Sequence, residues 1–222
     1  MPTTYAIPNG NQYFDISLWT GNTATQNIAN SGSMQPDLVW IKNRTSARYH
    51  NLYNSVSGTG KRLFSNAMDA EQSITASQYL SSFNSNGFSL GFDIDVNESP
   101  YTYVGWQWKA GGAAVTNTNG SITSSVSANP TSGFSIVTYT GNGSTGTVGH
   151  GLSSAPKMII IKDRTQIDNW PVYHAGLPTP ATNILRLQST TAVLTGRAEW
   201  NSTNPTSSVF SIGNDTAVNY SG

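Results

Sequence analysis

The chain has 222 residues, of which 11 are basic and 11 acidic, and it contains no cysteine. Such a balance lacks the clustered Lys and Arg of a nucleic-acid-binding or membrane-binding surface. The absence of cysteine excludes disulfides and thiol catalysis. We therefore expect neither nucleic acid nor membrane as a partner, and we expect no cofactor.

Apolar and aromatic content argues against disorder, because 36% of the residues are hydrophobic and 10% aromatic. The apolar stretches favour Thr, Val, Ile, Tyr, Phe and Trp, which are typical of β-strands. Gly, Asn, Pro and Ser clusters separate these stretches at short intervals, as turns do. The composition predicts an all-β protein.

Taken in chain order, the first predicted strand is Phe14–Thr20, which alternates apolar and polar residues. Leu38–Lys42 is almost continuously apolar, which predicts a strand buried on both faces. A short helical turn is expected within residues 65–80. Two further alternating stretches, Phe88–Val96 and Tyr101–Lys109, predict two more strands.

The two halves of the chain resemble each other. The segments that realign are Phe14–Asn22 with Phe134–Asn142 and Pro36–Thr45 with Pro156–Thr165, both offset by 120 residues (134 − 14), and Phe88–Gly91 with Phe210–Gly213, offset by 122 (210 − 88). Internal self-similarity of this kind indicates repeated domains. We predict two tandem antiparallel β-sandwich domains of the jelly-roll, lectin-like type, residues 1–112 and 113–222. Ser121–Ser127 would open the second domain in the position that Thr3–Ile7 has in the first.

One predicted strand lacks a counterpart, because nothing in the second copy corresponds to Tyr101–Trp108. Natural proteins pair or protect an exposed sheet edge. The missing strand would therefore come from the continuation of a longer chain, from a neighbouring subunit or from Thr3–Ile7. Strand addition between subunits would make the protein a homo-oligomer, and a trimer if it forms a fibre.

Catalytic motifs are scarce. The three histidines are His50, His150 and His174, and no Gly-x-Ser-x-Gly motif accompanies them. We therefore predict no catalytic triad. Asp93 and Asp95 would share a strand face, where they could form the carboxylate pair of a glycoside hydrolase or a solvated sheet edge. Together with Asn97 they are also a weak candidate for a loose calcium site.

Basic residues recur in both halves as Lys42 with Arg44 and Lys162 with Arg164. At two-residue spacing they would share a strand face and could hold an acidic sugar or a carboxylate of a neighbouring subunit. The alternative is that these long side chains lie along the sheet with their charged ends in water.

Aromatic residues form a second candidate binding site. Trp170, Tyr173 and His174 are expected in one loop, with Tyr49 and His50 as their counterparts. Such a cluster could bind a sugar or contact another subunit. The tryptophans that lie within predicted strands, by contrast, are expected to fill the sandwich cores; they are Trp40, Trp106 and Trp108.

Several of these motifs resemble repeat modules of phage virion proteins, chiefly tail-fibre and exterior proteins of marine and cyanobacterial phages. The similar segments are Trp106–Gly112, Gly120–Asn129, Phe134–Gly141, Val148–Leu152, Pro156–Arg164 and Trp170–His174. The resemblance implies lectin-like β-sandwiches without enzymatic activity on the outside of a virion, as a tail fibre or capsid decoration. Other virion subunits, and host-surface glycans, would be the partners. A carbohydrate-binding receptor-recognition module is the alternative, and a glycoside hydrolase the third possibility.

Overall fold

The computed structural model describes residues 9–221. Strands make up 37% of it and helix 8%, and the sheets are antiparallel, so the protein is all-β as predicted. The chain divides into two compact units, Met1–Leu63 with Gln72–Ala113 and Phe64–Glu71 with Ala114–Gly222. Thr3–Ile7, which we expected to form an opening strand, lies outside the described residues.

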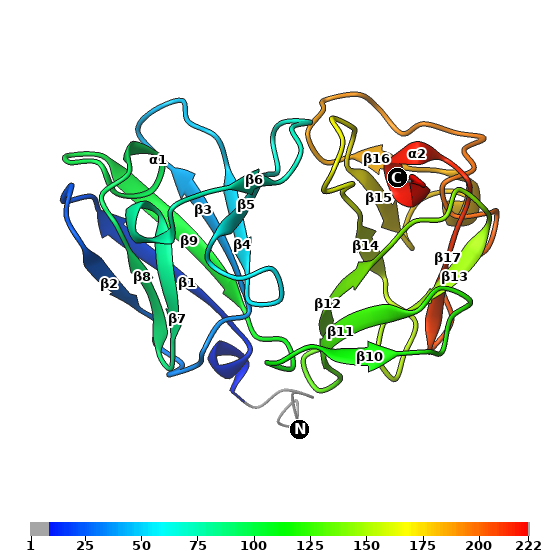
Figure 1. Ribbon diagram of the computed structural model, residues 1–222, viewed down its shortest axis with the longest axis horizontal. Coiled ribbons are helices and arrows are strands. Elements are labelled where there is room, and N and C mark those ends of the chain that lie inside the picture. The colour runs from blue at the N-terminus through cyan, green and yellow to red at the C-terminus, as the bar shows by residue number, and fades with distance from the viewer. Residues whose placement is uncertain (1–8, 222) are drawn as a thin grey trace, which may run out of the picture. The chain divides into compact units, whose positions relative to one another are not determined.

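The described residues of the first unit form two sheets. The larger follows the order β1 (Phe14–Thr20), β9 (Thr102–Trp108), β3 (Leu38–Asn43), β4 (Asn51–Asn54), β5 (Lys61–Phe64), β6 (Gln72–Ser73), so that β9 runs between β1 and β3 (Figure 1). The smaller follows the order β2 (Gln26–Ala29), β8 (Gly87–Leu90), β7 (Leu80–Asn84). A buried core contains side chains of both sheets, among them Trp19, Val39 and Tyr103 from the larger and Phe88 and Leu90 from the smaller.

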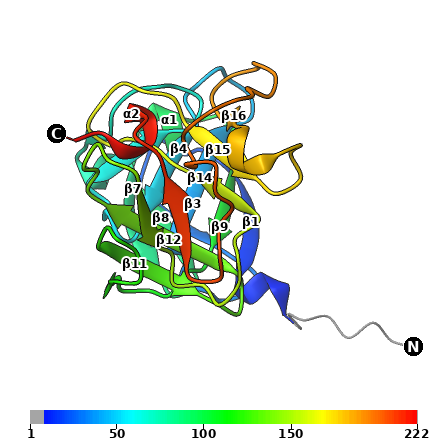
Figure 2. The ribbon, with the colours of Figure 1, turned by 90° about the vertical axis from the view of Figure 1, so that its right-hand side faces the viewer.

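In the second unit, the residues up to 221 form three smaller sheets. Their orders are β10 (Val115–Asn117), β11 (Ser124–Asn129), β12 (Phe134–Tyr139); β13 (Gly146–Gly149), β17 (Val209–Ile212); and β14 (Met158–Ile160), β15 (Pro171–His174), β16 (Leu185–Arg186). Figure 2 turns this unit toward the viewer. Its core surrounds Tyr173, Trp200, Phe210 and Ile212. β12 and β14 are each the last strand of their sheet.

Strand pairing in the two units has the same register. Ile28 of β2 faces Phe88 of β8 in the first unit, and Val148 of β13 faces Phe210 of β17 in the second. Val39 likewise faces Tyr53, as Ile159 faces Tyr173. These positions differ by the same 120 residues (148 − 28, 159 − 39, 173 − 53) and 122 residues (210 − 88) as the sequence segments.

Within the described part of the chain, helical structure is confined to short turns: η1 (Gly10–Gln12), η2 (Ala76–Gln78), α1 (Ile94–Asn97), η3 (Pro180–Thr182) and α2 (Thr216–Asn219). The strand predicted over Phe88–Val96 is therefore wrong beyond Leu90. The Asp93 carboxylate accepts a hydrogen bond from the backbone N–H of Asp95 at 2.8 Å and caps α1. This capping starts a helix where the alternating pattern alone indicated a strand. Within residues 65–80, only η2 is helical.

Each short α-helix ends in a buried asparagine that joins it to the loop after β1 in the first unit and after β12 in the second. The Asn97 amide donates to the carbonyl oxygens of Gly91 at 2.7 Å and Ala24 at 2.6 Å and accepts from the N–H of Asn22 at 3.2 Å. Asn219 makes the corresponding bonds with Gly213, Ser144 and Asn142. Backbone groups that would otherwise be buried without partners are satisfied in this way.

Candidate binding surface

The larger sheet of the first unit directs opposite side chains to its two faces. On the inner face, Gly105 lies against Trp19, where an added Cβ would be 3.0 Å from the indole ring. A glycine at this central position therefore leaves room for a large core side chain. The outer face carries large apolar side chains on three adjacent strands: Phe14, Ile16 and Leu18 on β1, Val104, Trp106 and Trp108 on β9, and Leu38 and Trp40 on β3. We call these eight residues the aromatic face.

Strand register arranges the aromatic face in rows. Ile16, Trp106 and Trp40 lie opposite one another across β1, β9 and β3. Phe14, Trp108 and Leu38 form the next row. The ring centroids of Phe14 and Trp108 are 5.0 Å apart, and those of Trp40 and Trp106 are 5.9 Å apart. Because the rings support one another, they form a preordered surface.

Apart from the buried Val104, the side chains of this face are at least partly open to solvent. Leu18 is 63% exposed, Ile16 49% and Phe14 38%, while Trp40, Trp106 and Trp108 are partly buried. Placing the three tryptophans in the sandwich core was therefore wrong, because they alternate with the core residues of their strands. The strand over Leu38–Lys42, predicted to be buried on both faces, has one buried face only.

Lys42 lies near the end of β3, and His50 directly precedes β4. Lys42 is half-buried, and its Nζ donates to the carbonyl oxygens of Asn43 at 2.6 Å and Ser46 at 3.3 Å. Burial lowers the pKa of the Lys42 ammonium, and burial together with that ammonium lowers the pKa of His50. Arg44 and Tyr49 are exposed.

The second basic pair has internal partners too. Lys162 is half-buried and donates to the carbonyl oxygen of Gln166 at 2.9 Å, and burial lowers its pKa. Arg164 makes a bidentate ion pair with Glu71, with N–O distances of 2.7 and 2.8 Å. That pair raises the pKa of Arg164. These cations thus stabilise turns of the protein itself.

The predicted aromatic loop does not form as expected. Trp170 and Tyr173 are each 3% exposed. The Trp170 indole donates to the carbonyl oxygen of Ala67 at 2.8 Å, and Tyr173 lies in β15 against Trp200, with ring centroids 5.8 Å apart. Of the three residues placed in this loop, His174 alone is exposed. Because the Trp170 and Tyr173 rings are both buried, neither offers a ring face on which a sugar could stack.

Asp93 and Asp95 do not share a strand face, because they belong to the start of α1. Asp95 accepts a hydrogen bond from Arg62 at 3.1 Å, while Asp93 is the helix cap. Burial and the nearby Asp93 raise the pKa of Asp95, although Arg62 opposes the shift. Asn97 turns its amide N–H groups to carbonyl oxygens, so the three residues are held as structural groups. No cluster of three or more metal-binding His, Asp or Glu side chains occurs within residues 9–221.

His150 is buried and has two backbone contacts. Its Nδ1 accepts from the N–H of Leu152 at 3.1 Å, so its Nε2 donates to the carbonyl oxygen of Thr206 at 3.2 Å. Burial lowers the pKa of His150, although the Thr206 carbonyl opposes the shift. The ring is thus a neutral structural group rather than an exposed base.

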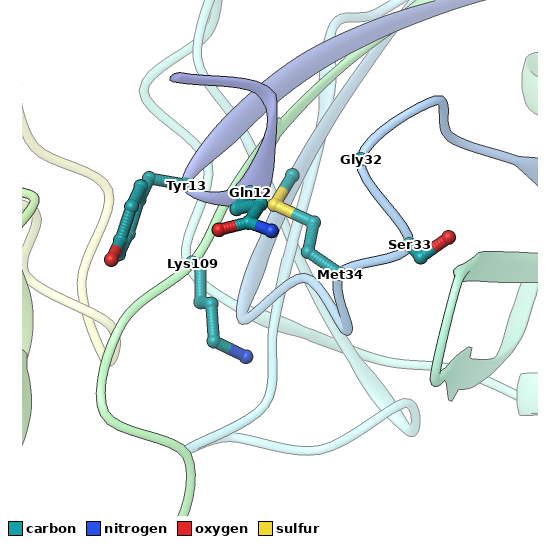
Figure 3. A pocket seen from close by; sticks show the side chains of 6 residues that line it. All are labelled: Gln12, Tyr13, Gly32, Ser33, Met34 and Lys109. Atoms are coloured by element: carbon teal, nitrogen blue, oxygen red, sulfur yellow. The ribbon is translucent and has the colours of Figure 1, made fainter. Parts of the chain in front are cut away.

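A shallow depression of 230 Å³ lies beside the start of β1 and is lined by Gln12, Tyr13, Gly32, Ser33, Met34 and Lys109 (Figure 3). Met34 extends toward Gln12 at its centre. Its lining contains no carboxylate and no histidine, so it brings together no acid–base pair. Among the described residues, no helix is long and apolar enough to cross a membrane.

The aromatic face was missed because size and hydrophobicity alone were taken to place tryptophan in the core. The alternation of residues along β9 indicates that its tryptophans lie on the face opposite Tyr103. Tyr103 and Gly105 share one face of β9, and Val104, Trp106 and Trp108 share the other. A strand with apolar residues on both faces predicts a second contact surface besides the core.

Comparison with known proteins gives a family without an assigned activity. Residues 9–222 match the family described as a domain of unknown function, DUF7483. No curated protein and no solved structure matches the chain. The match extends over nearly the whole sequence, including both units and the aromatic face. The chain therefore belongs to the DUF7483 family.

Proposed function

We propose that the protein is a non-enzymatic structural or adhesive component of the outside of a phage particle, a tail fibre or a capsid decoration. In this proposal it attaches to other virion subunits through the aromatic face. The exposed side chains of Phe14, Ile16 and Leu18 on β1, beside three tryptophans, are the observation that carries the proposal. The resemblance of the sequence motifs to phage virion modules supports the location.

The two units serve as copies of one lectin-like sandwich module in this proposal. Equal strand registers at offsets of 120 and 122 residues support common descent of the units. The same asparagine contacts at the end of α1 and α2 support it independently. Repetition of a module is common in elongated assemblies, where each copy adds length and contact area.

The chemistry of the aromatic face favours a protein partner over a sugar. Protein interfaces combine tryptophan and phenylalanine with aliphatic side chains, as here with Ile16 and Leu18. A sugar site needs polar groups that converge beside the ring, and the rows of this face are apolar. Large exposed apolar patches on soluble proteins mark interaction sites.

The test uses Leu18→Asp, which places a charge at the most exposed position of the aromatic face, with Ile167→Asp as its control. Ile167 is 75% exposed and belongs to the second unit, whereas the aromatic face belongs to the first. We expect Leu18→Asp to weaken self-association or attachment to purified particles at least ~10-fold, with the melting temperature unchanged. Ile167→Asp should have no effect. Sedimentation velocity and particle co-sedimentation measure these quantities, and equal behaviour of the two variants would contradict the proposal.

A carbohydrate-binding module is the second candidate, favoured by the partly exposed rings of Trp40, Trp106 and Trp108. Host-surface glycans would then stack on these rings. A glycan array made with host polysaccharides separates the two functions. Specific binding that Trp106→Ala abolishes would assign the face to glycan recognition. A glycoside hydrolase would need a carboxylate pair other than Asp93 and Asp95, because these cap α1 and pair with Arg62.

A further inference from the structure

β9 is an inner strand of the larger sheet in the first unit and pairs with β1 and β3 along their lengths. Backbone hydrogen bonds continue beyond the strand ends. The N–H groups of Gly21, Asp37 and Arg44 donate to carbonyl oxygens of residues 101, 108 and 102 at 2.8, 2.8 and 2.7 Å. Strand β9 therefore supplies hydrogen-bond partners for the backbone groups of β1 and β3 that face it.

The corresponding strands of the second unit have no such strand between them within residues 9–221. β12 corresponds to β1 and β14 to β3, at an offset of 120 residues (134 − 14 and 158 − 38). Both are end strands of separate sheets, and Figures 1 and 2 place β12 between β11 and β14. The N–H groups of Gly141, Lys157 and Arg164, which correspond to Gly21, Asp37 and Arg44, make no analogous bond among the described residues.

The core of the second unit is also less well covered at this position. Val39 is fully buried and Trp19 is 8% exposed in the first unit. Their counterparts Ile159 and Tyr139 are only partly buried, although the Tyr139 hydroxyl contacts the Val218 carbonyl just as the Trp19 indole contacts that of Val96. The inner-face side chains of β12 and β14 thus correspond in position to those of β1 and β3, but they are less buried because no strand of the described residues lies between β12 and β14.

We propose that the edges of β12 and β14 form an acceptor groove for an extended polypeptide segment with the chemistry of β9. The segment pairs antiparallel with both strands and completes the sheet. This groove is separate from the aromatic face, so the proposal stands or falls independently of the partner assigned to that face. It depends on the correspondence between the two units.

The groove specifies the chemistry of its occupant. On the inner face, the position that corresponds to Gly105 must be small, because Tyr139 and Phe210 approach each other there as Trp19 and Phe88 do, with ring centroids 6.3 and 5.7 Å apart. On the outer face, Met158 is 53% and Ile160 36% exposed, and they favour large apolar neighbours. The occupant therefore has a small inward residue between alternating outward aromatic or aliphatic ones, and it carries no charge at its centre.

The test uses a peptide with the sequence of residues 101–109, in which the residue corresponding to Trp106 is replaced by cysteine. In β9, Trp106 lies opposite Trp40, whose counterpart in the second unit is Ile160 (40 + 120). Because the chain has no cysteine, the Ile160→Cys variant offers one thiol. With an added mild oxidant that takes up the two electrons of the two thiols, we expect a disulfide between the variant and the peptide. The melting temperature of the unmodified chain should rise with the concentration of the peptide carrying Trp106.

Two matched controls define register and site. Met158→Cys lies two residues away on the same strand face and should cross-link at least ~10-fold more slowly, because it is out of register with the cysteine. Trp40→Cys should cross-link equally slowly, since β9 already occupies that place in the first unit. A scrambled peptide should not raise the melting temperature.

Three results would overturn the proposal. Equal cross-linking of Ile160→Cys, Met158→Cys and Trp40→Cys would show non-specific contact. Absence of both cross-linking and thermal stabilisation would show that the groove does not accept a strand. Binding that occurs only after removal of residues 1–8 would make that segment the occupant, in place of a segment with the chemistry of β9.

Discussion

Replacing Asn97 by alanine removes the most fully satisfied buried amide of the first unit. Asn97 is 0% exposed, and its side chain joins α1 to Gly91, Ala24 and Asn22 by four hydrogen bonds, two of them with Asn22. Loss of contacts to three backbone groups costs ~1 kcal/mol each, and an unpaired buried carbonyl of Gly91 adds ~1–2 kcal/mol. We expect Asn97→Ala to lower the free energy of unfolding of this unit by about 3–5 kcal/mol.

Urea denaturation and hydrogen exchange of the β8 and β9 amides measure this loss, since exchange resolves the two units separately. Asn97→Asp is the informative second variant. It preserves the size of the side chain and the acceptor for the Asn22 N–H, but it cannot donate to the carbonyl oxygens of Gly91 and Ala24. A cavity effect alone would leave Asn97→Asp stable. A cost below ~1 kcal/mol for Asn97→Ala would refute the reasoning, and Asn219→Ala should destabilise the second unit in the same way.

Much of the strand content follows from the sequence because alternation depends on local residue order. Phe14–Thr20 and Tyr101–Lys109 were predicted as strands, and they form β1 and β9. The break after Leu90 was missed, since an apolar residue at every second position also fits one turn of helix. The Asp93 cap, which decides between the two, is a single hydrogen bond.

The candidate site was harder to predict than the strands. Alternation shows that β9 has two different faces, but which of them meets the second sheet depends on residues distant in sequence. Gly105 marks the face that meets the second sheet, because the space left by its lack of a side chain is occupied by Trp19. The burial of Trp170 likewise depends on Ala67, 103 residues away, and no local pattern contains that contact.

Two further substitutions test the packing and the titration of buried groups. Gly105→Ala places a Cβ 3.0 Å from the Trp19 ring and should lower the free energy of unfolding by ~1–3 kcal/mol in urea, whereas Gly10→Ala, with no atom within 4 Å, should not. Burial lowers the pKa of His150 below its ordinary value of 6.5. As the pH falls, His150 is therefore protonated near pH 6.5 in the unfolded chain but only at a lower pH in the folded chain. The free energy of unfolding thus decreases as the pH falls from 6.5 to the lower pKa of the folded state. The corresponding position in the first unit is Asn30 (150 − 120), so His150→Asn introduces the residue found there, and an asparagine side chain does not titrate. Its urea midpoint should change less between pH 7 and pH 5 than that of the unmodified protein, and an identical pH dependence would show that the His150 ring is not the group responsible.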